Sequence, residues 1–573
     1  MTRSPLPLLS TVALLAAPAA AQFPAYTITG DDAGDFLGHG IGDAGDVNGD
    51  GYGDFVVGAP KDDNAGNSAG SVRIHSGATG SVLYMIDGGG TDQLGTAVSG
   101  AGDVNNDGFD DVIAGGPWHL GIGPIQGTIS VISGVDGSTL YQIEGPNTFS
   151  FFGGAVDGAG DLDNDGFDEF LVGASNDDGN GSDSGLVYVY GGIDGALIYM
   201  HSGDGISDQM GTCVAGLGDV NSDGVPDYMG GAPLDDNNGS NSGSVQVWSG
   251  IDGSVLYAFN GSGADHQFGK SVAALGDVNG DAHADFIVGE WHDALIAHHA
   301  GSVTVFSGID GSVIRQHFGQ SADDEFGQAV TGIGDYDGDT IGDYAVGAPG
   351  AGANGEVTLF SGVDGSLLGS VAGGALDTEF GAGLAGGMDV NNDGLGEFIV
   401  GAHLAQNATG EATVFSSISL LGTAYCFGDG SASPCPCGNN APTGVGCGNS
   451  TGGGAGLVAG GSTSVSADNL GFDAAGLLPG QPALLFSGMN AVNNGQGVPF
   501  GDGLRCAGGT VKRLGVRVPD ASGGANWGPG LAPLGEWGPG DVRRFQAWYR
   551  DPGGSPCGSG FNLSSGYEVT FTP

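Results

Sequence analysis

GDVNGDGYGDFVVGAP, at residues 45–60, recurs six more times along this chain of 573 residues. The second copy is GDVNNDGFDDVIAGGP at 102–117, and the later copies are GDLDNDGFDEFLVGAS, GDVNSDGVPDYMGGAP, GDVNGDAHADFIVGEW, GDYDGDTIGDYAVGAP and MDVNNDGLGEFIVGAH. Their first aspartates are spaced 57, 58, 58, 58, 58 and 54 residues apart. Self-similarity at a nearly fixed period indicates a repeat architecture with one supersecondary unit per copy.

Each copy contains four segments with strand-like composition. A segment such as GTAVSG precedes the acidic loop, DFVVGAP follows it, and GSVRIHSG and GSVLYMI come next. Apolar and polar residues alternate in these segments, and short glycine turns join them, which is typical of β-hairpins. Four antiparallel strands per unit, repeated radially, predict a β-propeller, with a stacked solenoid as the alternative.

The two ends of the repeat favour the propeller. The seventh copy has only three candidate strands and ends with GEATVFSS at 410–417, whereas a spare strand, AYTIT, lies at 25–29 ahead of the first copy. Pairing these segments would close a ring and remove two exposed sheet edges. We therefore expect an all-β chain: a seven-bladed β-propeller closed by an N-terminal strand over residues 22–418, followed by a small disulfide-bearing, β-sandwich-like domain over 419–573.

The acidic loops have the pattern D-x-[DN]-x-D-G-x-x-[DE]. Oxygen-bearing side chains at positions 1, 3, 5 and 9, with the position-7 carbonyl, resemble the ligand spacing of an EF-hand loop, and oxygen ligands without His or Cys side chains favour Ca²⁺. The expected ligands are Asp46, Asn48, Asp50, Tyr52 and Asp54; Asp103, Asn105, Asp107, Phe109 and Asp111; Asp161, Asp163, Asp165, Phe167 and Glu169; Asp219, Asn221, Asp223, Val225 and Asp227; Asp277, Asn279, Asp281, His283 and Asp285; Asp335, Asp337, Asp339, Ile341 and Asp343; Asp389, Asn391, Asp393, Leu395 and Glu397.

Up to seven Ca²⁺ ions are thus expected, with a structural rather than a sensing role. The alternative is that the loops are ordinary polar turns, for which Asp and Asn are well suited. Seven copies with every oxygen position filled favour the metal sites. Ala282 and Thr340 replace the glycine at position 6, which predicts weaker binding in those two loops.

These motifs resemble the FG-GAP repeats of the integrin α-subunit propeller. The FG element is matched at 152–153, 268–269, 326–327 and 380–381, and the GAP element at 58–60, 231–233 and 347–349. The resemblance spans about residues 24–418 and implies a seven-bladed ring, calcium on the loops between the first two strands, and an extracellular binding role. All seven loops are filled here, whereas integrin propellers fill only some, and integrin leg domains have no counterpart, so pairing with a β subunit is not implied.

Charge and the N-terminal segment limit the function classes. The chain has 12 basic and 66 acidic residues, a net charge of -54, which argues against binding to nucleic acids or anionic membranes. Residues 1–21 have the features of a secretory signal peptide cleaved before Gln22, with a buried helix as the alternative. No later apolar run is long enough for a membrane span. We expect a secreted or cell-surface protein, monomeric, without a membrane span.

Six of the seven cysteines lie after residue 420: Cys426, Cys435, Cys437, Cys447, Cys506 and Cys557. An even number in an exported region favours up to three disulfides, with 15 possible pairings, over a zinc site. Short alternating runs such as TVKRLGVRV indicate a small β-sandwich. No known functional family is evident in this part of the chain.

The loops between the second and third strands should lie on the face opposite the acidic loops. Trp118 and His119 in the second copy, and Trp291 and His292 in the fifth, pair aromatic rings with polar groups and could bind sugars. Ordinary loop packing is the alternative, and a transition-metal site that includes His298 and His299 is another.

No residue set has the pattern of a catalytic site. The sequence therefore favours a calcium-binding module for adhesion or recognition of extracellular proteins or glycans. Two alternatives remain open: a secreted hydrolase or lyase that acts on polysaccharide with the propeller as scaffold, and a structural protein of the cell envelope.

Overall fold

The computed structural model describes residues 23–120, 124–374, 378–416, 422–428, 430, 433–441, 445–460, 465, 470–519, 523–538, 540–552 and 555–571. The signal peptide expected at 1–21 lies outside these residues and stays a prediction. The domain boundary expected at 418/419 also lies outside them, between Ser416 and Gly422.

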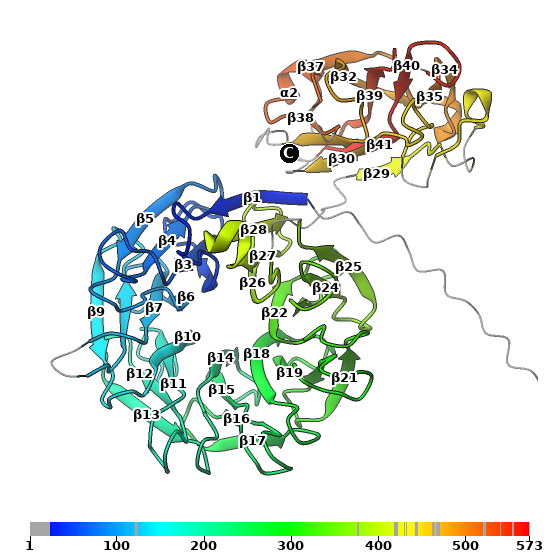
Figure 1. Ribbon diagram of the computed structural model, residues 1–573. Coiled ribbons are helices and arrows are strands. Elements are labelled where there is room, and N and C mark those ends of the chain that lie inside the picture. The colour runs from blue at the N-terminus through cyan, green and yellow to red at the C-terminus, as the bar shows by residue number, and fades with distance from the viewer. Residues whose placement is uncertain are drawn as a thin grey trace, which may run out of the picture.

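Seven four-stranded antiparallel sheets, or blades, are arranged around a ring (Figure 1). In each blade the first strand lies at the centre of the ring and the fourth at its rim. The strands of blades 1 to 3 are β2 (Ile41–Gly45), β3 (Asp54–Ala59), β4 (Ser71–His75) and β5 (Val82–Asp87); β6 (Ala97–Gly102), β7 (Asp111–Gly116), β8 (Thr128–Ile132) and β9 (Thr139–Glu144); β10 (Phe152–Gly160), β11 (Glu169–Ala174), β12 (Leu186–Tyr190) and β13 (Leu197–Ser202).

The remaining blades repeat this order. Their strands are β14 (Cys213–Gly218), β15 (Asp227–Ala232), β16 (Ser244–Trp248) and β17 (Val255–Asn260); β18 (Phe268–Gly276), β19 (Asp285–Glu290), β20 (Ser302–Phe306) and β21 (Val313–Phe318); β22 (Ala329–Gly334), β23 (Asp343–Ala348), β24 (Glu356–Phe360) and β25 (Leu367–Ala372); β26 (Gly383–Met388), β27 (Glu397–Ala402) and β28 (Glu411–Ser416), with a short helix α1 (Ala405–Ala408) before β28.

The core of the ring lies between neighbouring blades. The second strand of every blade is buried along its whole length, whereas most outer strands alternate exposed and half-buried residues. One cluster joins Val104 and Ile113 of blade 2 to Phe152 and Phe170 of blade 3. Each blade therefore buries its apolar residues against the next one, as expected for a sheet that is sandwiched on both faces.

The FG and GAP motifs have a direct structural meaning at these contacts. A Cβ atom placed on Gly173, in the GAP position of blade 3, would lie 2.1 Å from the carbonyl oxygen of Gly211, in the FG position of blade 4. The same approach, at 1.9–2.1 Å, recurs around the ring, including Gly401 of blade 7 against Gly38 of blade 1. We call the GAP residues the interlocking glycines: Gly58, Gly115, Gly173, Gly231, Gly289, Gly347 and Gly401. They allow the backbones of adjacent blades to meet without side chains between them.

The predicted closure of the ring is confirmed. Strand β1 (Phe23–Thr29) pairs antiparallel with β28, from Phe23 opposite Ser416 to Thr29 opposite Glu411. Blade 7 thus has the strand order β1-β28-β27-β26 and is built from both ends of the ring.

The C-terminal residues form a second set of sheets. The larger has the order β29-β41-β39-β32-β37, with β40 added on β39, and the smaller has the order β30-β31-β38; one apolar cluster containing Phe472, Trp527 and Phe545 joins them as two layers. The elements are β29 (Gly422–Tyr425), η1 (Pro436–Gly438), β30 (Gly456–Gly460), β31 (Gly471–Ala475), β32 (Ala483–Gly488), β33 (Asn490–Ala491), η2 (Val492–Gly495), β34 (Val498–Phe500), β35 (Gly503–Arg505), β36 (Ala507–Gly508), β37 (Lys512–Arg517), β38 (Ala525–Trp527), α2 (Ala532–Gly535), β39 (Val542–Arg550), β40 (Phe561–Leu563) and β41 (Gly566–Thr570).

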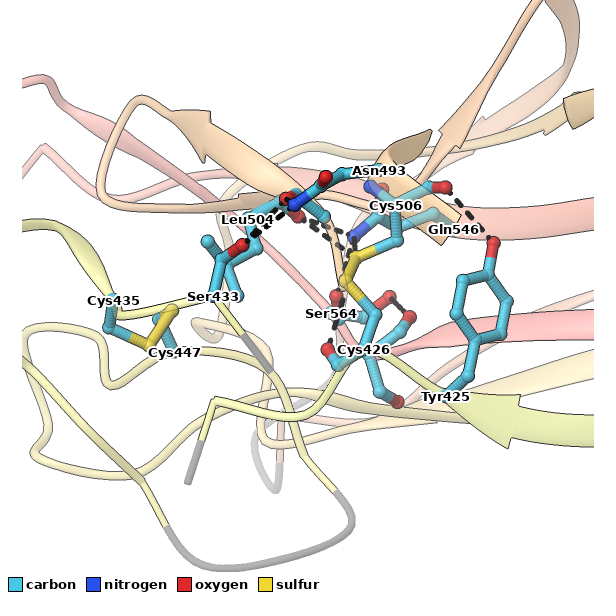
Figure 2. Close-up of a disulfide and its surroundings, with 12 residues drawn as sticks. Tyr425, Cys426, Ser433, Cys435, Cys447, Asn493, Leu504, Cys506, Gln546 and Ser564 are labelled. Carbon is cyan, nitrogen blue, oxygen red and sulfur yellow. Dashed lines mark hydrogen bonds between the residues drawn. A yellow bond between two sulfur atoms is a disulfide. The ribbon is translucent and has the colours of Figure 1, made fainter. Parts of the chain in front are cut away.

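All six C-terminal cysteines form disulfides, as predicted. The pairs are Cys426–Cys506, Cys435–Cys447 and Cys437–Cys557. Figure 2 shows the first pair beside Gln546, a fully buried side chain on β39. The Gln546 amide donates to the carbonyl oxygens of Leu504 and Ser564, both at 2.8 Å, and accepts from the Cys506 amide at 2.9 Å. The Gln546 amide thus fixes β39 to the Cys506 segment, and the disulfide joins that segment to Cys426.

Candidate metal-binding loops

The seven acidic loops join the first and second strands of the blades and share one internal hydrogen-bond pattern. In blade 1 the carboxylate of Asp46, at position 1, accepts the Asp50 amide at 3.0 Å and the Gly51 amide at 2.8 Å. Asp50, at position 5, accepts the Tyr52 amide at 3.0 Å. The same bonds to the position-1 carboxylate recur in the other six loops. These bonds curl each loop so that positions 1, 3 and 5 fall on its inner side.

The acid at position 9 begins the second strand and is buried in every blade. Asp54 accepts the amides of Val47 at 3.1 Å and Gly77 at 2.8 Å, and the side-chain nitrogen of Asn48 at 3.0 Å. Burial raises the pKa of Asp54 to about 7, and repulsion from Asp50 and Asp46 adds to the rise. This carboxylate therefore connects the loop to the turn between the third and fourth strands, and a nearby cation would offset its desolvation.

Where position 3 is asparagine, its side-chain nitrogen donates to the acid at position 9, so its side-chain oxygen faces the loop. In blade 7 Asn391 donates to Glu397 at 2.8 Å, and its Oδ1 atom is buried without a hydrogen-bond partner. A buried acceptor that lacks a donor is rare in proteins and fits a cation ligand. The donor set therefore suits a hard cation: carboxylate and amide oxygens, and main-chain carbonyls.

Two loops carry three carboxylates whose oxygens converge. Asp161, Asp163 and Glu169 in blade 3 each offer one oxygen within 4.8 Å of the others, and so do Asp335, Asp337 and Asp339 in blade 6. In these two loops the structure thus brings together three of the four acids that the sequence pattern grouped; Asp165 and Asp343 are not among the converging residues.

The two loops without glycine at position 6 keep the common shape. Ala282 and Thr340 adopt φ values of 70° and 75°, in the left-handed region that favours glycine. Their amides still donate to the position-1 carboxylates of Asp277 and Asp335, both at 2.8 Å. Weaker binding in these loops stays a prediction, and its physical basis would be backbone strain rather than a missing ligand.

Sequence reasoning missed a contact between neighbouring loops. Asp110, at position 8 in blade 2, accepts the Asp46 amide of blade 1 at 2.7 Å. Asp168 of blade 3 likewise accepts the Asp103 amide of blade 2 at 2.8 Å. Position 8 is acidic only in these two copies, and comparing this position across the seven copies could have predicted the contact.

On the opposite face the aromatic and histidine residues do not form one site. Trp118 packs edge-on against Phe151 with ring centroids 5.2 Å apart, and His119 lies 3.0 Å from a carboxylate oxygen of Asp92. Trp291 stacks on His292 at 3.9 Å. Blades 3 and 4 separate the two pairs along the ring, so any ligand role would involve two distinct surfaces.

The aspartates on this face also anchor loops. Asp62, Asp177 and Asp235 lie in the corresponding loops of blades 1, 3 and 4 and are buried. Asp62 accepts the Ser71 hydroxyl at 2.7 Å, and Asp177 accepts the Tyr188 hydroxyl at 3.0 Å. These bonds hold the loops between the second and third strands.

Comparison with known proteins agrees with the observed fold. The model of the FG-GAP repeat family matches residues 41–75. Integrin alpha-V of Gallus gallus is 30% identical over 204 residues, 32% of this chain and 19% of that protein. Integrin alpha-5 of Xenopus laevis is 30% identical over 205 residues, 33% of this chain and 19% of that protein, and integrin alpha-4 of Xenopus laevis is 26% identical over 235 residues, 38% and 22% respectively.

The chain thus spans about a fifth of the length of these integrin relatives. Residues 41–75 match the FG-GAP repeat family, and the propeller resembles that of integrin α subunits. In the described residues, no helix has the length and apolar character needed to cross a membrane.

Proposed function

We propose that the protein is an extracellular recognition module whose propeller is stabilised by Ca²⁺ and binds a protein or glycan ligand without catalysing a reaction. The observation that carries the proposal is the combination of an integrin-like FG-GAP ring with seven oxygen-only loops of one hydrogen-bond pattern. The proposal includes secretion of the protein and a domain boundary at 418/419, between the propeller and the C-terminal part.

The Ca²⁺ would be held by the side chains at positions 1, 3, 5 and 9 and the carbonyl at position 7. Burial, with repulsion from neighbouring carboxylates as a smaller cause, raises the pKa of Asp54, Asp111, Glu169 and Asp343 to about 7 in each case, and the charge of Ca²⁺ would offset both effects. We therefore expect the metal to stabilise the ring rather than to take part in ligand chemistry.

The first test is retention of the full chain on immobilised polysaccharides and extracellular matrix proteins, with Ca²⁺ and with chelator. Retention that depends on Ca²⁺ supports a recognition module. If a protein shown to be folded by circular dichroism is not retained on any of these supports, the recognition role is contradicted and a spacer role is favoured.

The second test locates the ligand surface. Trp118→Ala and Trp291→Ala each remove one aromatic surface on the face opposite the acidic loops. Loss of retention in one variant would assign the ligand to that blade. Unchanged retention in both, with an intact fold, would remove the two Trp-His pairs as candidate ligand sites.

A further inference from the structure

Blade 5 departs from the repeat at the end of its second strand. The residue after the interlocking glycine is alanine or glycine in six blades: Ala59, Gly116, Ala174, Ala232, Ala348 and Ala402. In blade 5 it is Glu290, the last residue of β19, and this carboxylic acid is only 3% exposed. A buried acid at a position otherwise reserved for the smallest residues needs a specific partner, because an isolated buried charge is unfavourable.

A histidine from the preceding loop lies beside this acid. His266, two residues before β18, occupies a position held elsewhere by Asp35, Asp92, Ser150, Asp208, Asp324 or Thr378. Its Nδ1 atom is 3.2 Å from Oε1 of Glu290 and 3.7 Å from Oδ1 of Asp293. Asp293 is 4% exposed, so one imidazole faces two buried carboxylates.

We propose that His266, Glu290 and Asp293 bind a divalent transition metal such as Zn²⁺, separately from the acidic loops. One ligand atom from each residue lies within 4.8 Å of the other two. Ligands at about 2.0–2.1 Å around a tetrahedral zinc are about 3.3 Å apart. The two measured separations from His266 bracket that value, so the metal needs only small shifts of the side chains.

The ligand type distinguishes this site from the seven loops. An imidazole with two carboxylates suits zinc and related metals, whereas Ca²⁺ prefers oxygen ligands alone. Three protein ligands also leave one tetrahedral position open to water, since His266 keeps about a fifth of its side chain exposed. In the described residues, the ion pairs of Glu290 and Asp293 involve His266 and no lysine or arginine.

Hydrogen bonds from neighbouring residues hold the three ligands in place. Ser262 donates its amide and its hydroxyl to Oε1 of Glu290, at 3.1 and 2.9 Å. The amide of Asp293 donates to the Glu290 carbonyl at 3.0 Å, and the amide of His292 donates to the His266 carbonyl at 3.3 Å. Such outer contacts orient metal ligands in known sites.

A second histidine group in the same blade is a weaker candidate. His298 and His299 lie near Asp323, but the side chains of His298 and Asp323 are 70% and 66% exposed. Mobile surface side chains hold a metal less tightly than buried ones. This group therefore provides a matched control for the test.

The experiment titrates the full chain with Co²⁺, a spectroscopic substitute for Zn²⁺, in Ca²⁺ that saturates the acidic loops. Visible absorption reports a low-symmetry cobalt site, and Zn²⁺ competition gives the relative affinity. We expect one equivalent of Co²⁺ to bind and Zn²⁺ to displace it. The absence of a cobalt band in saturating Ca²⁺, or a band that Zn²⁺ does not displace, would overturn the proposal.

Three variants locate the metal. Glu290→Gln keeps an acceptor for Ser262 but removes the charged ligand, and His266→Ser introduces the residue that blade 3 has at this position. We expect each to weaken Co²⁺ binding at least tenfold while the calcium-loaded protein keeps its circular dichroism. The double variant His298→Ala/His299→Ala should leave Co²⁺ binding unchanged. If instead that double variant loses the metal while Glu290→Gln keeps it, the site is the exposed pair and the proposal is wrong.

Discussion

Gly173→Ala should destabilise the ring through a backbone clash between blades. The added Cβ would lie 2.1 Å from the Gly211 carbonyl oxygen and 3.1 Å from the Ala155 side chain, whereas Cβ contacts below 3.0 Å essentially do not occur. Blades 3 and 4 would have to separate locally by about 1 Å or distort. The φ angle of Gly173 is not in the left-handed region, so the substitution tests packing alone.

The size of the effect follows from two opposing terms. Overpacking costs about 1–3 kcal/mol, and the upper end applies because the obstructing atom belongs to the backbone. Alanine in place of glycine regains about 0.5–1 kcal/mol by restricting the unfolded chain. We expect a net loss of about 2 kcal/mol in the free energy of unfolding.

Gly191→Ala, in the same blade, is the matched control. Its added Cβ would be 3.6 Å from the nearest atom, and the corresponding residues of other blades are Ser76, Ser133, Ser249, Ser307 and Ser361. We expect it to be neutral or slightly stabilising. Denaturant unfolding of the full chain in saturating Ca²⁺, followed by circular dichroism, measures both. If Gly173→Ala and Gly191→Ala differ by less than about 0.5 kcal/mol, the interlocking role of the GAP glycine is refuted.

Three further predictions concern the acidic loops, Asp43 on the innermost strand β2 of blade 1, and the disulfides. Asp161→Asn should lower the calcium content of the purified protein by one ion, measured by elemental analysis after dialysis, and an unchanged content would exclude this loop as a site. Burial raises the pKa of Asp43 to about 6, so its bound proton stabilises the fold near pH 4 and this contribution is lost as the pH rises through 6. Relative to Asp43→Asn, the wild type should therefore lose up to about 2–3 kcal/mol between pH 4 and 7 in denaturant unfolding, whereas a constant difference would contradict the desolvation of this carboxyl group. Replacing Cys426 and Cys506 together by alanine removes a disulfide of sequence separation 80 and should lower the unfolding free energy of the C-terminal part by up to about 4 kcal/mol; a loss below 1 kcal/mol by calorimetry would show that the sheets hold this segment unaided.

The fold could be predicted in detail because its determinants repeat. Seven copies of the acidic motif fixed the number of blades, and the strand count at the two ends predicted that residues 25–29 complete blade 7. The structure extends that strand to Phe23–Thr29. The grouping of loop acids also followed from local spacing, since positions 1, 3 and 5 lie within a single turn of chain.

The features that could not be predicted depend on contacts between different copies of the repeat, and residue spacing within one copy gives no information about such contacts. The bond from Asp46 to Asp110 joins residues 64 positions apart. The His266–Glu290–Asp293 group likewise unites two loops, and it becomes visible in the sequence only when each position is compared across all blades. The cysteines could be predicted to pair, but 15 pairings were possible, and only the arrangement of the sheets selects among them.

The shared construction of blade 7 constrains folding. Strand β1 can pair with β28 only after residue 416 has been synthesised, so blades 1 to 6 can form before the ring closes. Until then the outer edge of β28 and the strand β1 both lack a partner, and an incomplete ring can pair with a second chain instead. The slowest step should therefore be this last pairing across nearly 400 residues, and its partner is always the earliest strand to be synthesised. A chain interrupted anywhere before β28 would keep these edges unpaired. The β1–β28 pair can therefore form only when the whole propeller has been synthesised.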